Sequence, residues 1–259
     1  MNQIEHLYGE NTHILADPVL NSLLAKLCVP ETVQPAVNDL VEALYSRLMQ
    51  FAASMELKRK DVKLATRMTA IHSDQFYQGA IVDPSQKAVS VGLARAGTFP
   101  SHVCYSLLNR LLEPRNVRQD HIWAARMTNE SNQVVGANLG GTKIGGDVND
   151  TTVFLPDPMG ATGGTIDSVL NLYKKEIESK NAKFIALHLI ITPEYIRAVA
   201  KKHPDLKIYA LRLDRGLSPS EVLKTPPGTH LEKERGLNEN QYIVPGAGGI
   251  GEILNNSFC

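Results

Sequence analysis

Residues 157–165, Asp-Pro-Met-Gly-Ala-Thr-Gly-Gly-Thr, carry the residue types that can hold a phosphorylated sugar. They follow an apolar, β-branched segment at 151–155 and precede a helix-periodic segment that begins at Ile166, so a strand, a tight loop and a helix are predicted to meet here. Backbone N–H groups at the positive end of a helix dipole, helped by the hydroxyls of Thr162 and Thr165, form a cradle for phosphate. The alternative is a glycine-rich turn that binds nothing.

Asp157 stands at the predicted carboxyl end of the strand that leads into this loop. Its carboxylate can accept hydrogen bonds from sugar hydroxyls or help to hold a metal ion. A carboxylate beside a phosphate cradle suits a sugar phosphate, because the two ends of such a ligand need opposite treatment.

A second glycine-rich segment, residues 242–251, reads Tyr-Ile-Val-Pro-Gly-Ala-Gly-Gly-Ile-Gly. Residues 246–251 satisfy G-x-G-x-x-G, but only eight residues follow Gly251. A dinucleotide-binding unit needs a helix, a second strand and a ribose-binding acid after that motif, so this interpretation fails. Glycines still allow the backbone to approach a flat ligand closely, and bare N–H and C=O groups can recognise the edge of a planar base.

The elements around these two loops alternate between strand and helix, which predicts a parallel sheet with ligands at the carboxyl ends of its strands. A first helix begins after Asp17-Pro18, an N-cap followed by a proline at the first helical position. The other expected helices are 32–54, 100–112, the cradle helix from 166, and 193–202; the expected strands are 87–94, 121–128, 151–155, 184–191 and 206–213.

Three segments fall outside this alternation. Residues 58–72 are rich in basic residues and are expected to form an exposed strand or arm. Residues 129–150 are polar and glycine-rich, which predicts a long functional loop. The motifs at 214–217 and 234–237 echo each other, and we interpret the interval between them as a surface insertion.

Composition sets broad limits. The chain has 259 residues, and its 27 Lys and Arg balance its 27 Asp and Glu. No global charge therefore argues for a nucleic-acid or membrane partner. Three widely spaced cysteines without a metal-like pair, no long apolar run and no signal-peptide pattern favour the cytoplasm.

The two loops and their surroundings resemble the uracil phosphoribosyltransferase family. The family's phosphoribosyl loop reads Asp-Pro-Met-x-Ala-Thr-Gly-Gly-Ser/Thr, which residues 157–165 match throughout. Residues 94–97 are similar to the family's Arg-Ala-Gly turn, and residues 236–246 are similar to its Gly-Leu-Asn-Glu-x-Gly-Tyr-Ile-Ile/Val-Pro-Gly stretch. The resemblance covers most of the chain from about residue 17.

This resemblance implies an α/β protein with the type I phosphoribosyltransferase fold. We expect a central, mainly parallel sheet flanked by helices, a small hood from the N-terminal helices and the C-terminal loop, and an extended β-arm. The expected division is an N-terminal extension (1–16) and a single domain (17–259), which contains the helical hood part (17–57), the arm (58–82), the surface insertion (216–235) and the base-binding loop with the C-terminus (236–259).

The implied reaction transfers the phosphoribosyl group of 5-phosphoribosyl 1-pyrophosphate to uracil and gives UMP and pyrophosphate, a step of pyrimidine salvage. The resemblance also implies Mg²⁺ bound mainly through the pyrophosphate of the donor, no assigned protein ligand to the metal, a homodimer or larger homo-oligomer, and a nucleotide as a candidate effector. Arg95 and Asp157 are the expected catalytic residues. The expected donor-binding residues are Arg95, Arg126, Asp157, Pro158, Met159, Gly160, Ala161, Thr162, Gly163, Gly164, Thr165 and Gly249; those for uracil are Tyr242, Ile243, Gly248, Gly249 and Ile250.

The chain departs from the family at several of these positions. The family has Asp where this chain has Gly249, a second Asp at Glu252 and Arg at Ile253, and its flap arginine is displaced by one at Arg126 or lost to Met127. These departures leave open a second interpretation, a degenerate homologue that binds a nucleotide or phosphoribosyl ligand as a regulatory module. They also predict that Gly249→Asp raises activity.

Overall fold

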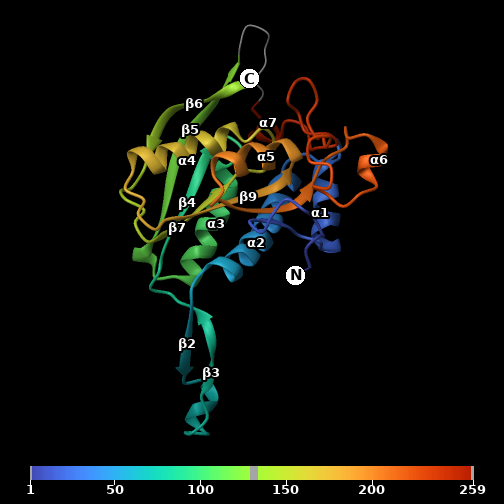
Figure 1. Ribbon diagram of the computed structural model, residues 1–259. Helices are drawn as coiled ribbons and strands as arrows, with labels where there is room; N and C mark the ends of the chain where they lie inside the picture. The colour runs from blue at the N-terminus through green and yellow to red at the C-terminus, as the bar shows by residue number, and fades with distance from the viewer. Residues whose placement is uncertain (1, 129–133, 258–259) are drawn as a thin grey trace.

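The computed structural model of the chain describes residues 2–128 and 134–257, and the side chains of residues 124–138 lie outside this description. Figure 1 shows the arrangement of the elements. The strands are β1 (Thr12–Ile14), β2 (Arg59–Leu64), β3 (Tyr77–Val82), β4 (Lys87–Ala94), β5 (Val117–Thr128), β6 (Val134–Lys143), β7 (Thr151–Pro156), β8 (Met159–Gly160), β9 (Lys183–Ile191) and β10 (Lys207–Leu213). The α-helices are α1 (Pro18–Cys28), α2 (Ala36–Glu56), α3 (Thr98–Leu111), α4 (Gly164–Glu176), α5 (Pro193–Lys202), α6 (Ser220–Leu223) and α7 (Ile250–Asn255), with 3₁₀ turns η1 (Arg67–Ala70) and η2 (Pro114–Asn116).

The main sheet has the strand order β1-β10-β9-β7-β4-β5-β6, and the short β8 also pairs with β9. In this order, each neighbouring pair from β1 through β10, β9, β7 and β4 to β5 is parallel, and β6 runs antiparallel to β5. The predicted α/β class with a mainly parallel sheet is therefore confirmed. The carboxyl ends of β4, β5, β7 and β9 meet at one edge of the sheet, where ligand sites of such folds lie.

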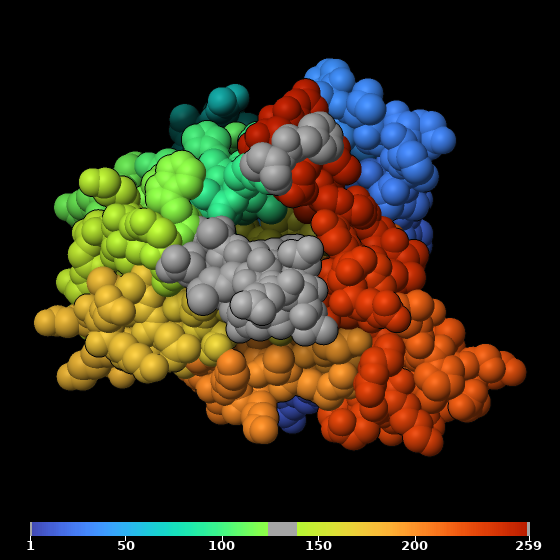
Figure 2. Space-filling view, turned by 90° about the horizontal axis from the view of Figure 1, so that it is seen from above, coloured from blue at the N-terminus to red at the C-terminus, as the bar shows by residue number. Residues whose placement is uncertain are grey.

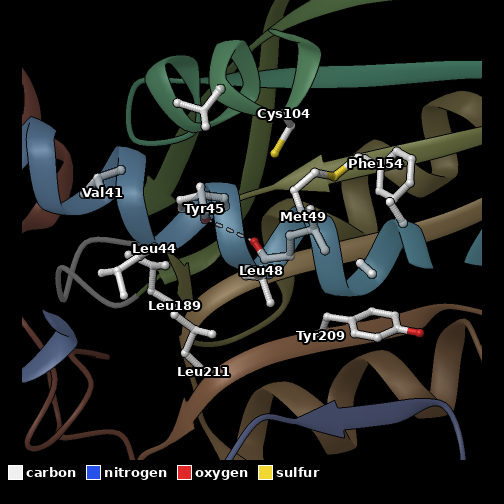
Figure 3. Packing of buried hydrophobic residues seen from close by; sticks show 14 of the residues in the cluster. Val41, Leu44, Tyr45, Leu48, Met49, Cys104, Phe154, Leu189, Tyr209 and Leu211 are labelled. Atoms are coloured by element: carbon white, nitrogen blue, oxygen red, sulfur yellow. Dashed lines mark hydrogen bonds between the residues drawn. The ribbon is translucent and has the colours of Figure 1, made fainter. Parts of the chain in front are cut away.

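Two hydrophobic clusters cover the two faces of this sheet. One contains the buried stripes of α1, α2 and α3 together with Ile250 and Leu254 of α7. The other contains the buried faces of α4 and α5. Figure 3 shows α2 packing its apolar side chains against strand and helix residues from distant parts of the chain; the labelled residues are Val41, Leu44, Tyr45, Leu48, Met49, Cys104, Phe154, Leu189, Tyr209 and Leu211. Of the helices in the part of the chain that the structure describes, none has the length and apolar character needed to cross a membrane.

Helix starts follow local chemistry. Asp17 caps α1 by accepting hydrogen bonds from the backbone N–H of Val19 and Leu20. Helix α2 begins at Ala36, so the expected start at residue 32 is wrong. Pro35 lies inside the expected range, and proline has no N–H and disfavours a helical conformation at the residue before it. The helix therefore begins after this proline.

The expected loop at 129–150 is wrong over much of its length, because residues 134–143 form strand β6. The hydrogen bonds of β6 go to the backbone of β5, with Ile122 opposite Thr142 and Arg126 opposite Ala137. A glycine-rich sequence can form such an edge strand because the ladder is made by backbone groups. The side-chain pattern therefore gave no strand signal here.

Strands β2 and β3 form an antiparallel hairpin of their own, with Arg59 opposite Val82 and Leu64 opposite Tyr77. The hairpin projects away from the body of the molecule (Figure 1). It falls within the range expected for the arm, 58–82.

The N-terminal segment and the 216–235 segment are joined to the body and to each other. Strand β1 lies within the expected extension, yet it pairs in parallel with β10 at the edge of the main sheet. The Leu7 N–H donates to the Pro227 carbonyl at 2.8 Å. The ends of the 216–235 segment also meet, because the fully buried Glu234 pairs with Arg215 at 2.9 Å.

Candidate active site

The donor loop, residues 157–165, connects β7 to α4 at the carboxyl edge of the sheet. Gly163 occupies the N-cap position of α4 with a φ of +84°, and no side chain caps the helix. A Cβ on Gly163 would lie 2.8 Å from Val199 Cγ2 on α5. Glycine is thus required both by the backbone conformation and by the close approach of α5. The Gly164 N–H donates to Thr162 Oγ1 at 3.4 Å. The N–H groups of the first turn of α4 lie at the positive end of the helix dipole, where an anion binds favourably.

This loop opens into a cavity of about 610 Å³. Figure 2 shows its mouth as a hollow between the green and the red parts of the chain. The expected site residues that line it are Arg95, Asp157, Met159, Ala161, Thr162, Gly163, Gly164, Thr165, Tyr242, Ile243, Gly248, Gly249 and Ile250. Donor-loop and base-loop residues far apart in the sequence are therefore brought to one cavity.

Two expected site residues have a different surrounding. The carbonyl of Pro158 accepts hydrogen bonds from the N–H groups of Leu189 and Ile190 in β9. A Cβ on Gly160 would lie 2.8 Å from Ile191 Cγ2. Both residues join the loop to β9 and are absent from the described cavity lining. The side chain of Arg126, the third exception, lies outside the described residues.

A buried histidine on β9 is hydrogen-bonded to the backbone of the donor loop. His188 on β9 is fully buried, and its Nδ1 lies 2.6 Å from the carbonyl oxygen of Asp157. Its Nε2 lies 2.7 Å from the hydroxyl of Tyr195. Burial lowers the pKa of His188 to about 4, so the ring is neutral at pH 7. Nδ1–H then donates to Asp157, and Nε2 accepts from Tyr195.

From the sequence, no partner of His188 can be identified and an ordinary structural role is expected; the only signal is a histidine within an otherwise apolar strand. Such a residue needs hydrogen-bond partners when it is buried. Both of its partners come from elements that only the fold brings together.

The base loop, residues 242–251, has little regular structure until α7 begins and is held by side chains from elsewhere. Asp214 Oδ2, just after β10, accepts from the Gly246 N–H at 2.7 Å, and Arg212 Nη2 donates to the Gly246 carbonyl at 3.0 Å. Asp214 is almost fully buried, and both of its oxygens also pair with Arg212. One ion pair therefore holds both backbone groups of a single glycine.

The segment leading into the base loop is held by a second carboxylate. Glu194, in the first turn of α5, accepts from the N–H of Gly236 at 3.0 Å and of Leu237 at 3.3 Å. Asn238 Oδ1 accepts from the N–H groups of Asn240 and Tyr242, which closes the turn before the loop. Asn238 belongs to the stretch that resembles the family, but its role was not identified from the sequence, and neither was Glu194.

Arg95 is hydrogen-bonded to α7 and to the residue segment that follows it. Its Nη2 donates to Glu252 Oε1 at 3.2 Å, and its Nη1 donates to the carbonyl and the hydroxyl of Ser257 at 2.7 and 3.0 Å. The Arg95 and Glu252 side chains are 33% and 34% exposed, so water and ligands can reach both. The guanidinium belongs to the described lining of the same cavity as the donor loop, where it can bind a second anionic group.

Trp123 on β5 is a further cavity residue that sequence reasoning missed. It is 62% exposed, and it lies opposite Gly141 of β6. A large exposed aromatic ring at a cavity is a candidate surface for ligand contact. It is also the single tryptophan of the chain, so its fluorescence can report on the site.

Comparison with known proteins identifies the family. The family model for uracil phosphoribosyltransferase matches residues 14–230. A protein named uracil phosphoribosyltransferase from Lactococcus lactis subsp. lactis (strain IL1403) is 39% identical over 93% of this chain and 96% of its own length. The chain belongs to the uracil phosphoribosyltransferase family. A Streptococcus pneumoniae protein of the same name is 29% identical with the same coverage of both chains.

A solved structure shares the fold of this chain. The AQ2163 protein from Aquifex aeolicus superposes with a TM-score of 0.70 at 19% identity, covering 94% of this chain and 97% of that one. The family-model match ends at residue 230, before the base loop. The departures from the family at Gly249 and Glu252 lie in this unmatched part.

Proposed function

We propose that this protein transfers the phosphoribosyl group of 5-phosphoribosyl 1-pyrophosphate to uracil, giving UMP and pyrophosphate. One observation carries the proposal: a phosphate cradle and a glycine-rich backbone loop, 80 or so residues apart in the chain, open onto the same cavity. Membership of the uracil phosphoribosyltransferase family supports it and favours the enzyme over a regulatory homologue that binds without turnover.

In the proposed reaction, the bond from C1′ of the ribose to the pyrophosphate oxygen breaks and a bond from N1 of uracil to C1′ forms. The N1 proton leaves the base, and the electron pair of the broken bond leaves with pyrophosphate. The transition state concentrates positive charge on the ribose, so positioning and electrostatics matter more than a strong base.

The donor loop binds the phosphoribosyl donor. The N–H groups of the first turn of α4, with Thr162 and Thr165, bind the 5′-phosphate. Asp157 binds the ribose hydroxyls, and its backbone is held by the neutral ring of His188. Arg95, which lines the same cavity, binds the pyrophosphate.

The base loop holds the acceptor. Its described lining includes Tyr242, Ile243, Gly248, Gly249 and Ile250. Gly248 has a φ of +66° and open space where a Cβ would stand, so a flat base can approach its backbone closely. Main-chain N–H and C=O groups there read the edge of uracil.

A magnesium ion on the donor would neutralise the charge of the leaving pyrophosphate. Among the residues with described positions, no group of three or more His, Cys, Asp and Glu could hold a metal ion. The acidic residues of the described cavity lining are Asp157 and Glu252. We propose that the ion is held mainly through the diphosphate of the donor, near these carboxylates.

We further propose a homodimer or larger homo-oligomer. The β2–β3 hairpin and its tip expose apolar side chains that a second copy could cover, namely Leu64, Met68, Ile71 and Tyr77. Size-exclusion chromatography with light scattering gives the molar mass, and a monomer at micromolar concentration would contradict this proposal.

The catalytic proposal is tested by incubating the protein with the donor, Mg²⁺ and uracil, and quantifying UMP by chromatography. Cytosine, adenine and hypoxanthine serve as alternative acceptors. We expect UMP, with uracil strongly preferred. Donor binding without UMP would instead support the regulatory interpretation, and transfer to a purine would contradict the assignment of the base loop.

A further inference from the structure

Three charged side chains belong to the described lining of the cavity: Arg95, Asp157 and Glu252. Asp157 belongs to the donor loop, whereas Glu252 comes from the first turn of α7. Arg95 and Glu252 form an ion pair at 3.2 Å. The Arg95 guanidinium, which we assign to the pyrophosphate, thus already has an anionic partner on the protein.

The Glu252 carboxylate rests on the backbone of Gly249. A Cβ on Gly249 would lie 2.5 Å from Glu252 Oε2 and 3.3 Å from its Cδ. Gly249 has a φ of −79°, a value that other residues adopt readily. Its backbone conformation therefore does not require glycine, but a side chain at this position would have to displace the carboxylate of Glu252 from where it stands.

Helix α7 fixes the position of this carboxylate. Ile250 and Leu254 anchor the helix in the core beneath it. Gln34 Nε2 donates to the carbonyls of Ile253 and Leu254 at 3.3 and 3.0 Å. Ser257, beyond the helix, accepts from the same arginine as Glu252. Residues at both ends of α7 therefore hold the Arg95 guanidinium.

We propose that Glu252 is a positioning residue for Arg95 and makes binding of the phosphoribosyl donor depend on a divalent cation. The proposal rests on the function proposed above. A diphosphate that reaches Arg95 also comes close to the Glu252 carboxylate, which repels it. A cation bound to the diphosphate removes this repulsion, so the site selects the metal complex of the donor over the free anion. Gly249 leaves room for the carboxylate that makes this selection.

The test measures donor affinity through the fluorescence of Trp123, once with Mg²⁺ and once with EDTA. The quantity compared is the ratio of the dissociation constant in EDTA to the dissociation constant in Mg²⁺. Glu252→Gln keeps the size of the side chain and removes its charge. Since the pair is partly exposed, we expect this variant to lower the ratio about two- to fivefold relative to the unmodified protein. Glu176→Gln is the matched control, because Glu176 is exposed at the far end of α4. It should leave the ratio unchanged.

A second variant tests the role of Gly249. Gly249→Ala places a methyl group on the Glu252 carboxylate and should lower the ratio in the same direction, with no further change when it is combined with Glu252→Gln. Gly79→Ala is the control, because its Cβ would also meet the end of a flexible side chain, the Tyr77 hydroxyl at 2.7 Å, outside the described cavity lining. It should not change the ratio.

An unchanged ratio in Glu252→Gln overturns the inference, and additive effects of the two substitutions overturn the assigned role of Gly249. UMP formation by the unmodified protein is measured in parallel. Donor binding with the expected ratios but without UMP would contradict the proposed enzyme and leave the Glu252 inference standing. UMP formation with equal ratios in all variants would support the proposed enzyme and overturn the Glu252 inference.

Discussion

The donor loop and the base loop face one cavity but are built in opposite ways. The donor loop lies between two long elements, β7 and α4, and its key conformation is set locally by Gly163 at a φ of +84°. The base loop depends on carboxylates from elsewhere, since Asp214 lies 32 residues before Gly246 and Glu194 lies 42 residues before Gly236. The conformation of the phosphate cradle is thus set within one strand–loop–helix unit, and His188 of β9 adds a support at Asp157. The supports named for the base loop all come from outside that loop.

The sharpest test of the donor side is Gly163→Val. The substitution forces a side chain into a left-handed backbone position and against Val199. Each lost donor to a charged phosphate costs about 1.5 to 3 kcal/mol, so we expect donor affinity to fall at least about 100-fold. Trp123 fluorescence gives the affinity. Gly228→Val is the matched control, because Gly228 has a φ of +88° and a Cβ there would lie 2.9 Å from Leu7.

Gly228 lies outside the described cavity lining, so the control should lower stability and keep donor affinity. Equal loss of donor affinity in both variants would mean that Gly163 acts through general stability rather than at the phosphate.

The base side is tested by Asp214→Asn. The substitution weakens the buried pair with Arg212 and the hydrogen bond from the Gly246 N–H. We expect about 2 to 3 kcal/mol lower stability and a KM for uracil raised roughly 10- to 100-fold. Donor affinity should stay within about twofold. Thermal unfolding and steady-state kinetics with each substrate varied in turn measure these effects. A donor affinity that falls as much as uracil affinity would contradict the separate support of the two loops.

The buried His188 predicts a pH dependence of stability on the donor side. Burial lowers its pKa from 6.5 to about 4. Below pH 6.5 the unfolded chain takes up a proton that the folded protein does not accept until about pH 4. Stability from this group is therefore lost as the pH falls through that window, by about 2 kcal/mol between pH 7 and pH 5.

His188→Asn removes the titrating ring and retains a donor for the Asp157 carbonyl. It should lower stability at pH 7 and show a smaller additional loss at pH 5 than the unmodified protein. Chemical denaturation at both pH values measures the difference, and His6 and His13, whose pKa values are also lowered mainly by burial, are common to both proteins. The same loss in both proteins would show that His188 does not cause the pH dependence.

The smallest expected effect concerns Gly249→Asp, for which the sequence alone predicts a gain in activity. The structure reverses the expected direction, because the new side chain would meet the carboxylate of Glu252. We expect donor affinity with Mg²⁺ to fall about two- to fivefold and to recover when Glu252→Gln is added. Donor titrations and rates of UMP formation of the single and double variants check this, and a higher rate in the single variant would favour the prediction made from the sequence.

The sequence predicted the features that local chemistry determines. The alternation of strands and helices, the bounds of β4 and α5, and the strand–loop–helix unit around Gly163 follow from periodicity, caps and glycine placement. It failed where partners are distant. Strand β6 is defined by the backbone of β5, and the supports from His188 and Glu194 depend on how separate elements pack.

Residue identity also misled at one point. Family comparison marked Gly249 and Glu252 as two separate departures, whereas in the structure they share one space. Only three-dimensional proximity relates a missing side chain at one position to a carboxylate three residues away.

The 216–235 segment closes on itself, since the Leu217 N–H donates to the Arg235 carbonyl at 3.1 Å beside the buried Arg215–Glu234 pair. A chain that departs and returns at one point can change length without shifting the register of the residues downstream. The exposed Thr229 and His230 are therefore a suitable place for grafted sequence, since a peptide tag or a small domain inserted between them would leave Gly236 and the loop after it in place.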